Sequence, residues 1–215
     1  MLELGLIFTT ALFVGLSGAM MPGPLTAVTL EHTFRRGYAA APLVTLGHGL
    51  LEIAVVILLL VGLGDYLALP YVAGGIGLAG GAVLAWMGCG MIRSAAGGGL
   101  SLESSPEREQ SGRTPLGDGI IATASNPYWF LWWATIGAGY VALSSERGLP
   151  GVLSFFGGHI LADFLWFSLL AVVIVSGKKW FTNGVYRWII IGLGLFLVAF
   201  SLYFFWSGLK IILTQ

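Results

Sequence analysis

Two stretches of the sequence, 111 positions apart, carry nearly the same pattern. Residues 36–52 read RGYAAAPLVTLGHGLLE, and residues 147–163 read RGLPGVLSFFGGHILAD. Both begin with Arg-Gly, and both contain a Gly-His pair that is followed by three residues and then a carboxylate, which is Glu52 in the first copy and Asp163 in the second. Each copy runs from a loop into a long apolar segment. Because ionisable residues inside a membrane are costly and usually functional, the duplication predicts a transporter built from two repeated halves.

The composition indicates a membrane protein. Hydrophobic residues make up 57% of the 215 residues and charged residues only 9%, and the mean hydropathy is +0.89. A soluble protein of this length has too little interior to hide so much apolar surface, so membrane lipids are the expected surroundings. The formal net charge of zero predicts no nucleic-acid partner. The single cysteine, Cys89, excludes an internal disulfide and a thiolate metal cluster.

Six segments are long and apolar enough to cross a bilayer, which takes about 20 residues. They are Leu4–Phe34, Ala39–Gly62, Tyr71–Ile92, Gly117–Leu143, Val152–Ser176 and Tyr186–Leu213. The first is expected to be a span rather than a signal peptide, because it lacks a basic start and a clear cleavage site. The predicted fold class is an all-α polytopic membrane protein with six transmembrane helices.

Prolines interrupt the first and the fourth of these segments. Pro22-Gly23-Pro24 lies near the middle of the first, and Asn126-Pro127 lies in the fourth. Proline removes a backbone donor and disfavours helix in the residue before it. Helices broken at corresponding positions of two halves often form a transporter binding site, so helices 1 and 4 are predicted to be broken there.

The basic residues predict the orientation of the chain. Most of them lie in three loops on one side: Arg35, Arg36, Arg93, Arg108, Arg113, Lys178, Lys179 and Arg187. The positive-inside rule places these loops in the cytoplasm and both termini outside. Arg147 is expected on the opposite side of the membrane from these loops, which is where an inverted second copy would place the counterpart of Arg36. The sequence therefore predicts one membrane domain of two inverted three-helix repeats, residues 1–94 and 117–215, joined by a hydrophilic cytoplasmic linker at 95–116.

The histidine and the carboxylate of each copy are four residues apart and share one helix face. A charge facing lipid near mid-membrane costs about 2.5–3.5 kcal/mol, so Glu52 and Asp163 are expected to face inward and to meet. Two neighbouring carboxylates cannot both ionise cheaply. One is therefore expected to hold a proton, which His48 or His159 can relay. The alternative is a neutral pair in each half that only ties its helix to a neighbour.

The two helix breaks are expected to bind the substrate. A half-helix amino end attracts a carboxylate and a carboxyl end attracts an ammonium, and an amino acid carries both groups. The predicted substrate-binding residues are Pro22, Gly23, Pro24, Asn126 and Pro127. The alternative is a packing kink satisfied by nearby hydroxyls. The aromatic run at 128–133 either forms a cation–π wall or packs against lipid and helices, and we favour the second interpretation. His32 is expected at the membrane interface.

The run Met21-Pro22-Gly23-Pro24, followed by Arg36-Gly37 and Gly47, resembles the lysine exporter family (LysE/RhtB amino-acid translocators). Asn126-Pro127 at the start of an aromatic-rich segment is similar to the same family, and the resemblance covers the whole chain. It implies a prokaryotic exporter of amino acids in the cytoplasmic membrane, driven by proton exchange, with a homodimer as one assembly.

The four ionisable residues leave the substrate open, since the two His–acid pairs are not common to every member of that family. Two anionic groups suit a cationic amino acid such as lysine or arginine. The set His48, Glu52, His159 and Asp163 equally suits a divalent metal ion. An enzyme is disfavoured because no nucleophile elbow, phosphate loop or zinc-protease helix is present, and no cofactor is predicted. The sequence thus predicts a proton-coupled amino-acid exporter, with a divalent metal transporter as the alternative.

Overall fold

The chain is helical wherever its structure is described. The computed structural model describes residues 2–21, 23–62, 69–97, 114–177 and 182–214, and every regular element in these ranges is a helix. In chain order they are α1 (Leu2–Ala19), α2 (Pro24–Arg36), α3 (Ala40–Leu60), α5 (Pro70–Ala96), α6 (Pro115–Ala124), α7 (Pro127–Trp132), the π-helix η2 (Trp133–Gly137), α8 (Ala138–Ser145), α9 (Gly148–Gly177) and α10 (Asn183–Leu213). The predicted all-α fold is confirmed.

Within the described ranges, five helices are each long and apolar enough to cross a membrane: α1, α3, α5, α9 and α10. The structure differs from the sequence prediction at the fourth expected segment, Gly117–Leu143. This segment is divided among α6, α7, η2 and α8. None of these pieces has the roughly 20 residues that a span needs. Most of the expected linker, residues 98–113, lies outside the described residues.

The first helix break separates α1 from α2. Gly23 precedes α2 in an extended conformation, and Pro24 occupies the first helical position. A proline there costs little because the first amides of a helix have no intrahelical partner. The predicted break in helix 1 is confirmed, although Pro22 itself lies outside the described residues.

The second helix break separates α6 from α7. The Asn126 side-chain oxygen accepts a hydrogen bond from the Tyr128 backbone N–H at 3.1 Å, and Pro127 is the first residue of α7. Asparagine is a strong N-cap and proline is favoured directly after it. The dipeptide therefore starts a new helix, and the predicted break in helix 4 is confirmed.

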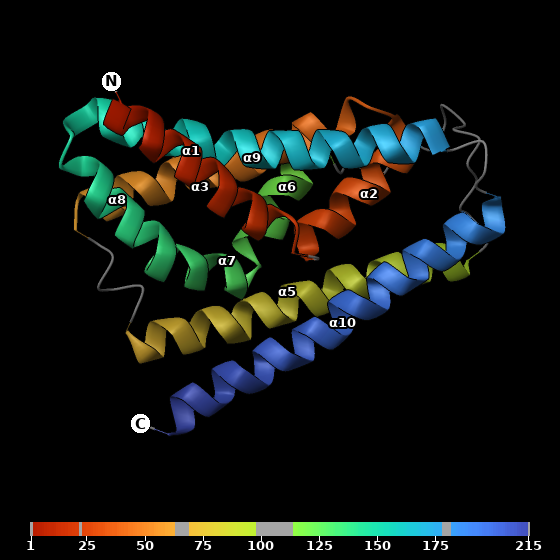
Figure 1. Ribbon diagram of the computed structural model, residues 1–215. Coiled ribbons are helices and arrows are strands. Elements are labelled where there is room, and N and C mark those ends of the chain that lie inside the picture. Colours follow the sequence, from red (N-terminus) through yellow and green to blue (C-terminus); the bar gives the residue numbers. More distant parts are fainter. Residues whose placement is uncertain (1, 22, 63–68, 98–113, 178–181, 215) are drawn as a thin grey trace.

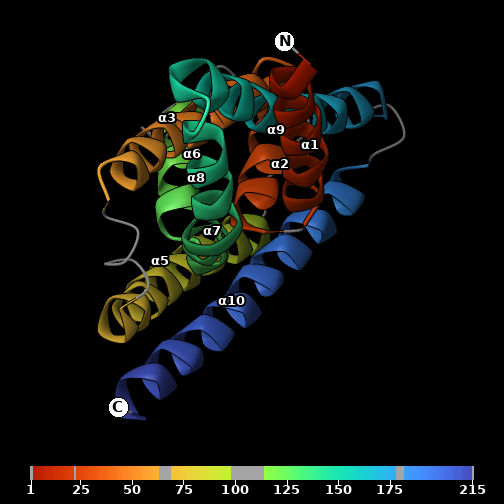
Figure 2. The same cartoon turned by 60° about the vertical axis from the view of Figure 1, so that its left-hand side comes forward.

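The two halves of the chain pack against each other through exchanged helices (Figure 1). α1 of the first half packs along α9 of the second half, and α6 of the second half packs along α3 of the first. α2 also contacts α3, and α8 contacts α9. α5 and α10 lie side by side as a pair on one side of the other helices, as Figures 1 and 2 both show.

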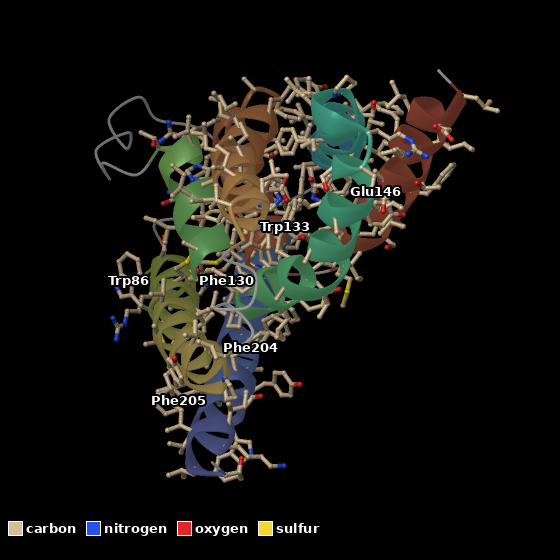
Figure 3. All side chains as sticks on the ribbon, turned by 90° about the vertical axis from the view of Figure 1, so that its left-hand side faces the viewer. Trp86, Phe130, Trp133, Glu146, Phe204 and Phe205 are labelled. Atoms are coloured by element: carbon tan, nitrogen blue, oxygen red, sulfur yellow. The ribbon has the colours of Figure 1, made fainter. Side chains whose placement is uncertain are left out.

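The long helices α3 and α9 bury their ionisable side chains, and the large side chains that they expose are apolar. On α3 the exposed side chains recur every three or four positions: Leu43, Leu46, Leu50, Ile53 and Ile57. The opposite face of this helix buries His48 and Glu52. Figure 3 shows the same division elsewhere, with Trp86 and Phe205 pointing outward and Trp133 lying among the helices. This inside-out arrangement is what a lipid solvent requires.

The glycines of the duplicated pattern have matching roles. Gly37 and Gly148, where the chain turns into α3 and α9, have φ values of +78° and +62°, which side chains rarely adopt. Gly47 and Gly158 lie where helix backbones touch. A Cβ on Gly47 would overlap the Leu116 carbonyl of α6, and one on Gly158 would overlap the carbonyl of the α1 residue Phe8.

Candidate functional site

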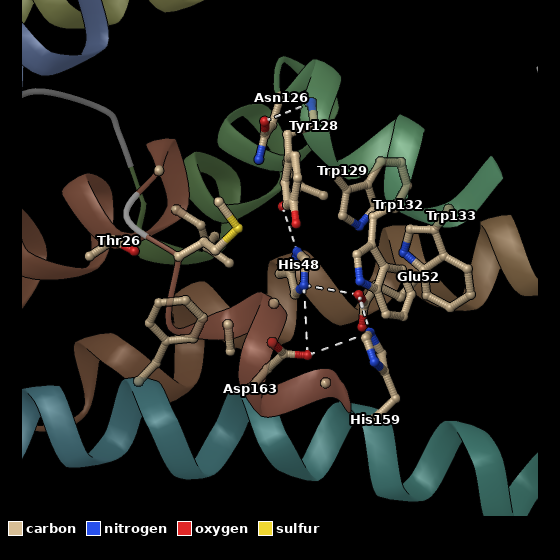
Figure 4. Close-up of a pocket in the computed structure, with 18 of the residues that line it drawn as sticks. Thr26, His48, Glu52, Asn126, Tyr128, Trp129, Trp132, Trp133, His159 and Asp163 are labelled. Atoms are coloured by element: carbon tan, nitrogen blue, oxygen red, sulfur yellow. Dashed lines mark hydrogen bonds and ion pairs between the residues drawn. The ribbon is translucent and has the colours of Figure 1, made fainter. Parts of the chain in front are cut away.

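The two His–acid pairs meet between α3 and α9 (Figure 4). His48 and Glu52 extend from α3, His159 and Asp163 from α9, and all four are buried. His48 Nε2 and His159 Nε2 lie 3.0 and 2.9 Å from the same oxygen, Glu52 Oε1. The same nitrogens lie 3.8 and 3.9 Å from Asp163 Oδ2. Glu52 therefore bridges the histidines, and these four residues are termed the His–acid cluster.

The two histidines differ at their second ring nitrogen. His48 Nδ1 lies 2.9 Å from the Thr123 hydroxyl of α6, and that hydroxyl lies 2.8 Å from the Gly119 carbonyl. His159 Nδ1 is buried without a hydrogen-bond partner. It faces Gly15 of α1, where an added Cβ would lie 3.0 Å away. Sequence reasoning missed Thr123, because a threonine in an apolar segment gives no local sign of its partner.

Aromatic rings surround His159. Its ring stacks on Trp132, with centroids 4.7 Å apart, and meets Trp133 edge-on at 5.3 Å. Phe155 stacks at 6.0 Å. The tryptophans predicted to pack against lipid and helices thus pack inside, around the cluster. The π-helix begins at Trp133, and π-helical turns frequently occur at functional sites.

A cavity of about 90 Å³ adjoins the cluster and reaches both helix breaks. Met21 and Gly23 line it from the first break, and Asn126 and Tyr128 line it from the second. The remaining lining includes the cluster, Thr123 and three tryptophans, Trp129, Trp132 and Trp133. The space is large enough for several water molecules.

The predicted substrate-binding residues divide into two groups. Gly23 and Asn126 line the cavity. Pro24 and Pro127 are buried at the starts of α2 and α7 and do not line it. Pro127 instead packs against Gly80 of α5. Pro22 lies outside the described residues.

The cavity lining contains both unpaired donors and unpaired acceptors. The indole nitrogens of Trp129 and Trp133 are buried without a hydrogen-bond partner, and so are Glu52 Oε2 and Asp163 Oδ2. An indole N–H only donates and a carboxylate oxygen accepts. An unpaired buried group costs about 1–3 kcal/mol. The site is therefore suited to a ligand that carries both an acceptor and a donor.

A second buried acid–base pair lies apart from the cavity. His32 Nε2 of α2 is 2.8 Å from Asp118 Oδ2 in the first turn of α6, and both side chains are buried. His32 is thus buried between α2 and α6, and its expected position at the membrane interface stays a prediction. Sequence reasoning also missed Asp118, whose place near a helix start reads as ordinary capping.

The cluster also has the residue types of a metal site. His48, Glu52 and Asp163 could each offer one ligand atom, with these atoms within 4.8 Å of one another. Metal–ligand distances for zinc are about 2.0–2.2 Å, with the nitrogen deprotonated. The nitrogen–oxygen contacts of 2.9 and 3.0 Å are those of N–H···O hydrogen bonds, and two ligands of one such ion also lie about 3 Å apart. The spacing of these atoms therefore fits a shared proton as well as a shared metal.

The chain is similar to a family of translocators and to two bacterial proteins. The model of the LysE type translocator family matches residues 16–208. "Chemotactic transduction protein ChpE" of Pseudomonas aeruginosa is 30% identical over 171 residues, which cover 78% of this chain and 82% of that protein. "Putative amino acid efflux protein YcgF" of Bacillus subtilis is 24% identical over 205 residues, covering 95% and 97%. Among solved structures, none matches the chain significantly.

Proposed function

The chain belongs to the LysE type translocator family, and we propose that it exports amino acids across the cytoplasmic membrane in exchange for protons. The family match and the amino acid efflux name of the Bacillus relative support transport of this class. The observation that carries the proposal is the cavity that joins both helix breaks to the His–acid cluster. The protein acts as a transporter and not as an enzyme.

The unpaired groups of the cavity match the two charged ends of an amino acid. The substrate carboxylate accepts hydrogen bonds from the indole N–H groups of Trp129 and Trp133, which lack other partners. The substrate ammonium donates to one of the two carboxylate oxygens that lack a hydrogen bond, Glu52 Oε2 and Asp163 Oδ2. Because the site holds two carboxylates, it favours a substrate with a second cationic group, such as lysine or arginine.

The proposed architecture is two inverted three-helix repeats, with the broken segment α6–α8 as the counterpart of α1–α2. The exchanged packing of α1 on α9 and α6 on α3 supports this symmetry. The start of α1 and the end of α10 lie at the same end of the molecule in Figure 1. Arg35, Arg36 and Arg93 in the last turns of α2 and α5, at the other end, support termini outside the cell. The homodimer implied by the family resemblance stays a prediction.

Transport by purified protein in proteoliposomes tests the proposal. An acidic vesicle interior should drive uptake of labelled lysine or arginine, and uptake should stop when an ionophore collapses the pH gradient. Labelled leucine tests whether a cationic side chain is needed, and manganese and zinc uptake tests the metal alternative. Movement of a divalent cation without any amino acid would overturn the proposal.

Replacing Trp133 with phenylalanine is expected to weaken amino-acid binding about tenfold, because one donor to the substrate carboxylate is lost. Binding of cadaverine, which is lysine without its carboxylate, should be unchanged. Affinities measured by competition against labelled lysine check both points. Trp166→Phe is the matched control, since its indole nitrogen is also buried without a partner but lies outside the cavity lining. Equal weakening of lysine and cadaverine would contradict the assignment.

A further inference from the structure

The hydroxyl of Thr123 can complete the hydrogen bonds of His48 in two protonation states. A hydroxyl has one hydrogen, and this one lies 2.8 Å from the Gly119 carbonyl and 2.9 Å from His48 Nδ1. If Thr123 donates to the carbonyl, the hydrogen between Thr123 and His48 must sit on Nδ1. If Thr123 turns and donates to His48, Nδ1 carries no hydrogen.

These two arrangements differ by one proton on the His48–Glu52 pair. The 3.0 Å contact between His48 Nε2 and Glu52 Oε1 holds one hydrogen in either case. With Nδ1 also protonated the pair holds two hydrogens, and with Thr123 turned it holds one. Both His48 nitrogens are hydrogen-bonded in both arrangements, so neither state leaves a buried ring nitrogen unpaired.

His159 has no hydroxyl that hydrogen-bonds to its Nδ1. Its Nε2 contacts the same Glu52 oxygen at 2.9 Å, but its Nδ1 faces Gly15, which has no side chain, and is buried without a partner. A second proton on His159 would therefore create a buried N–H with nothing to accept it. The two halves of the duplicated pattern are unequal at this point.

We propose that Thr123 is a positioning residue that makes His48, and not His159, the histidine that takes up and releases the coupled proton. The titratable groups around His48 are Glu52 on its own helix, His159 and Asp163 on α9, and Tyr128 on α7, which lines the same cavity. The described parts of α1, α2, α8 and α10 bring no titratable side chain to this cavity. The effect of Thr123 on transport rests on the proposed function, which is proton-coupled transport. The protonation of the His48 ring can be measured without any transport.

Nitrogen-15 NMR of histidine-labelled protein in nanodiscs is the direct test, since the chain has only three histidines. His48→Gln assigns the His48 signals. On lowering the pH from about 9 to about 5, wild-type His48 should pass from one ring N–H to two, while His159 keeps one. In Thr123→Val, His48 should keep one over the range in which the wild type gains the second. Thr123→Ser should behave as wild type.

Thr45→Val is the matched control for a lost buried hydroxyl. Thr45 is fully buried on α3 and donates to the Ala41 carbonyl at 2.9 Å, but it does not line the cavity. A Thr123→Val spectrum identical to wild type, a second proton gained by His159, or a Thr123→Ser protein that matches Thr123→Val would each overturn the proposal.

Transport measurements supply the functional readout. Thr123→Val should lower transport driven by a pH gradient about tenfold, and by more than it lowers lysine counterflow at equal pH, because counterflow needs no net proton movement. Thr123→Ser should restore driven transport. If the wild type moves no amino acid, the proposed function fails, while the NMR result still decides the role of Thr123.

Discussion

Replacing Glu52 with glutamine is expected to abolish amino-acid transport driven by a pH gradient, with a fall of at least about 100-fold in initial rate. Both histidines contact Glu52 Oε1, at 3.0 and 2.9 Å. Glutamine keeps the size of the side chain but cannot hold a proton or a charge. Breaking a buried pair costs about 3–5 kcal/mol of stability. A cost of that size on the proton-carrying states of the cluster slows transport by more than two orders of magnitude, at about 1.4 kcal/mol per tenfold.

Initial rates in proteoliposomes measure this loss, and two further carboxylates calibrate it. Asp163→Asn should lower the rate less, by about tenfold, because Asp163 Oδ2 lies 3.8 and 3.9 Å from the histidine nitrogens. Glu3→Gln removes an exposed acid that pairs with Arg147 at 2.9 Å, so the rate should stay within about twofold. Wild-type transport by Glu52→Gln would rule out the cluster as the coupling site.

The helix breaks could be predicted from the sequence because their causes are local. Proline lacks a backbone donor, and asparagine caps the helix that follows. Pro24 and Asn126-Pro127 therefore break the helix regardless of which other helices pack against it. The division of the fourth segment into short helices was harder to predict from the sequence. The π-helix at Trp133–Gly137 depends on how α7 and α8 pack, and hydropathy reports only that the segment is apolar.

The convergence of the His–acid cluster could also be predicted, because residues four apart share a helix face and lipid excludes charge from the outer face. The unequal contacts of Glu52 and Asp163 with the histidines could not be predicted. Glu52 reaches both histidines because it has one more methylene than Asp163, and only the approach of α3 to α9 makes that length matter. Thr123, Asp118 and the inward tryptophans were missed or misread for the same reason: their partners lie on helices far away in sequence.

Replacing Gly47 or Gly158 with alanine is expected to destabilise the protein strongly and to nearly equal extents. A Cβ on Gly47 would overlap the Leu116 carbonyl, and one on Gly158 would overlap the Phe8 carbonyl. Both obstacles are backbone atoms, which cannot move aside as a flexible side chain does, so α3 must separate from α6, or α9 from α1. Overpacking of this kind costs about 1–3 kcal/mol or more, which lowers the melting temperature by about 2–12 °C in a chain of this length.

Thermal unfolding of the detergent-purified variants measures both effects. Gly75→Ala and Gly139→Ala are the controls, because an added Cβ at either helical position meets nothing within 4 Å. They should match or exceed the wild-type melting temperature, since alanine favours helix over glycine by about 1 kcal/mol. Equal losses at Gly47 and Gly158 are what the proposed inverted repeat requires, because these residues occupy the same place in the two copies. A large loss at one and none at the other would mean that the duplicated pattern no longer encodes matching helix contacts.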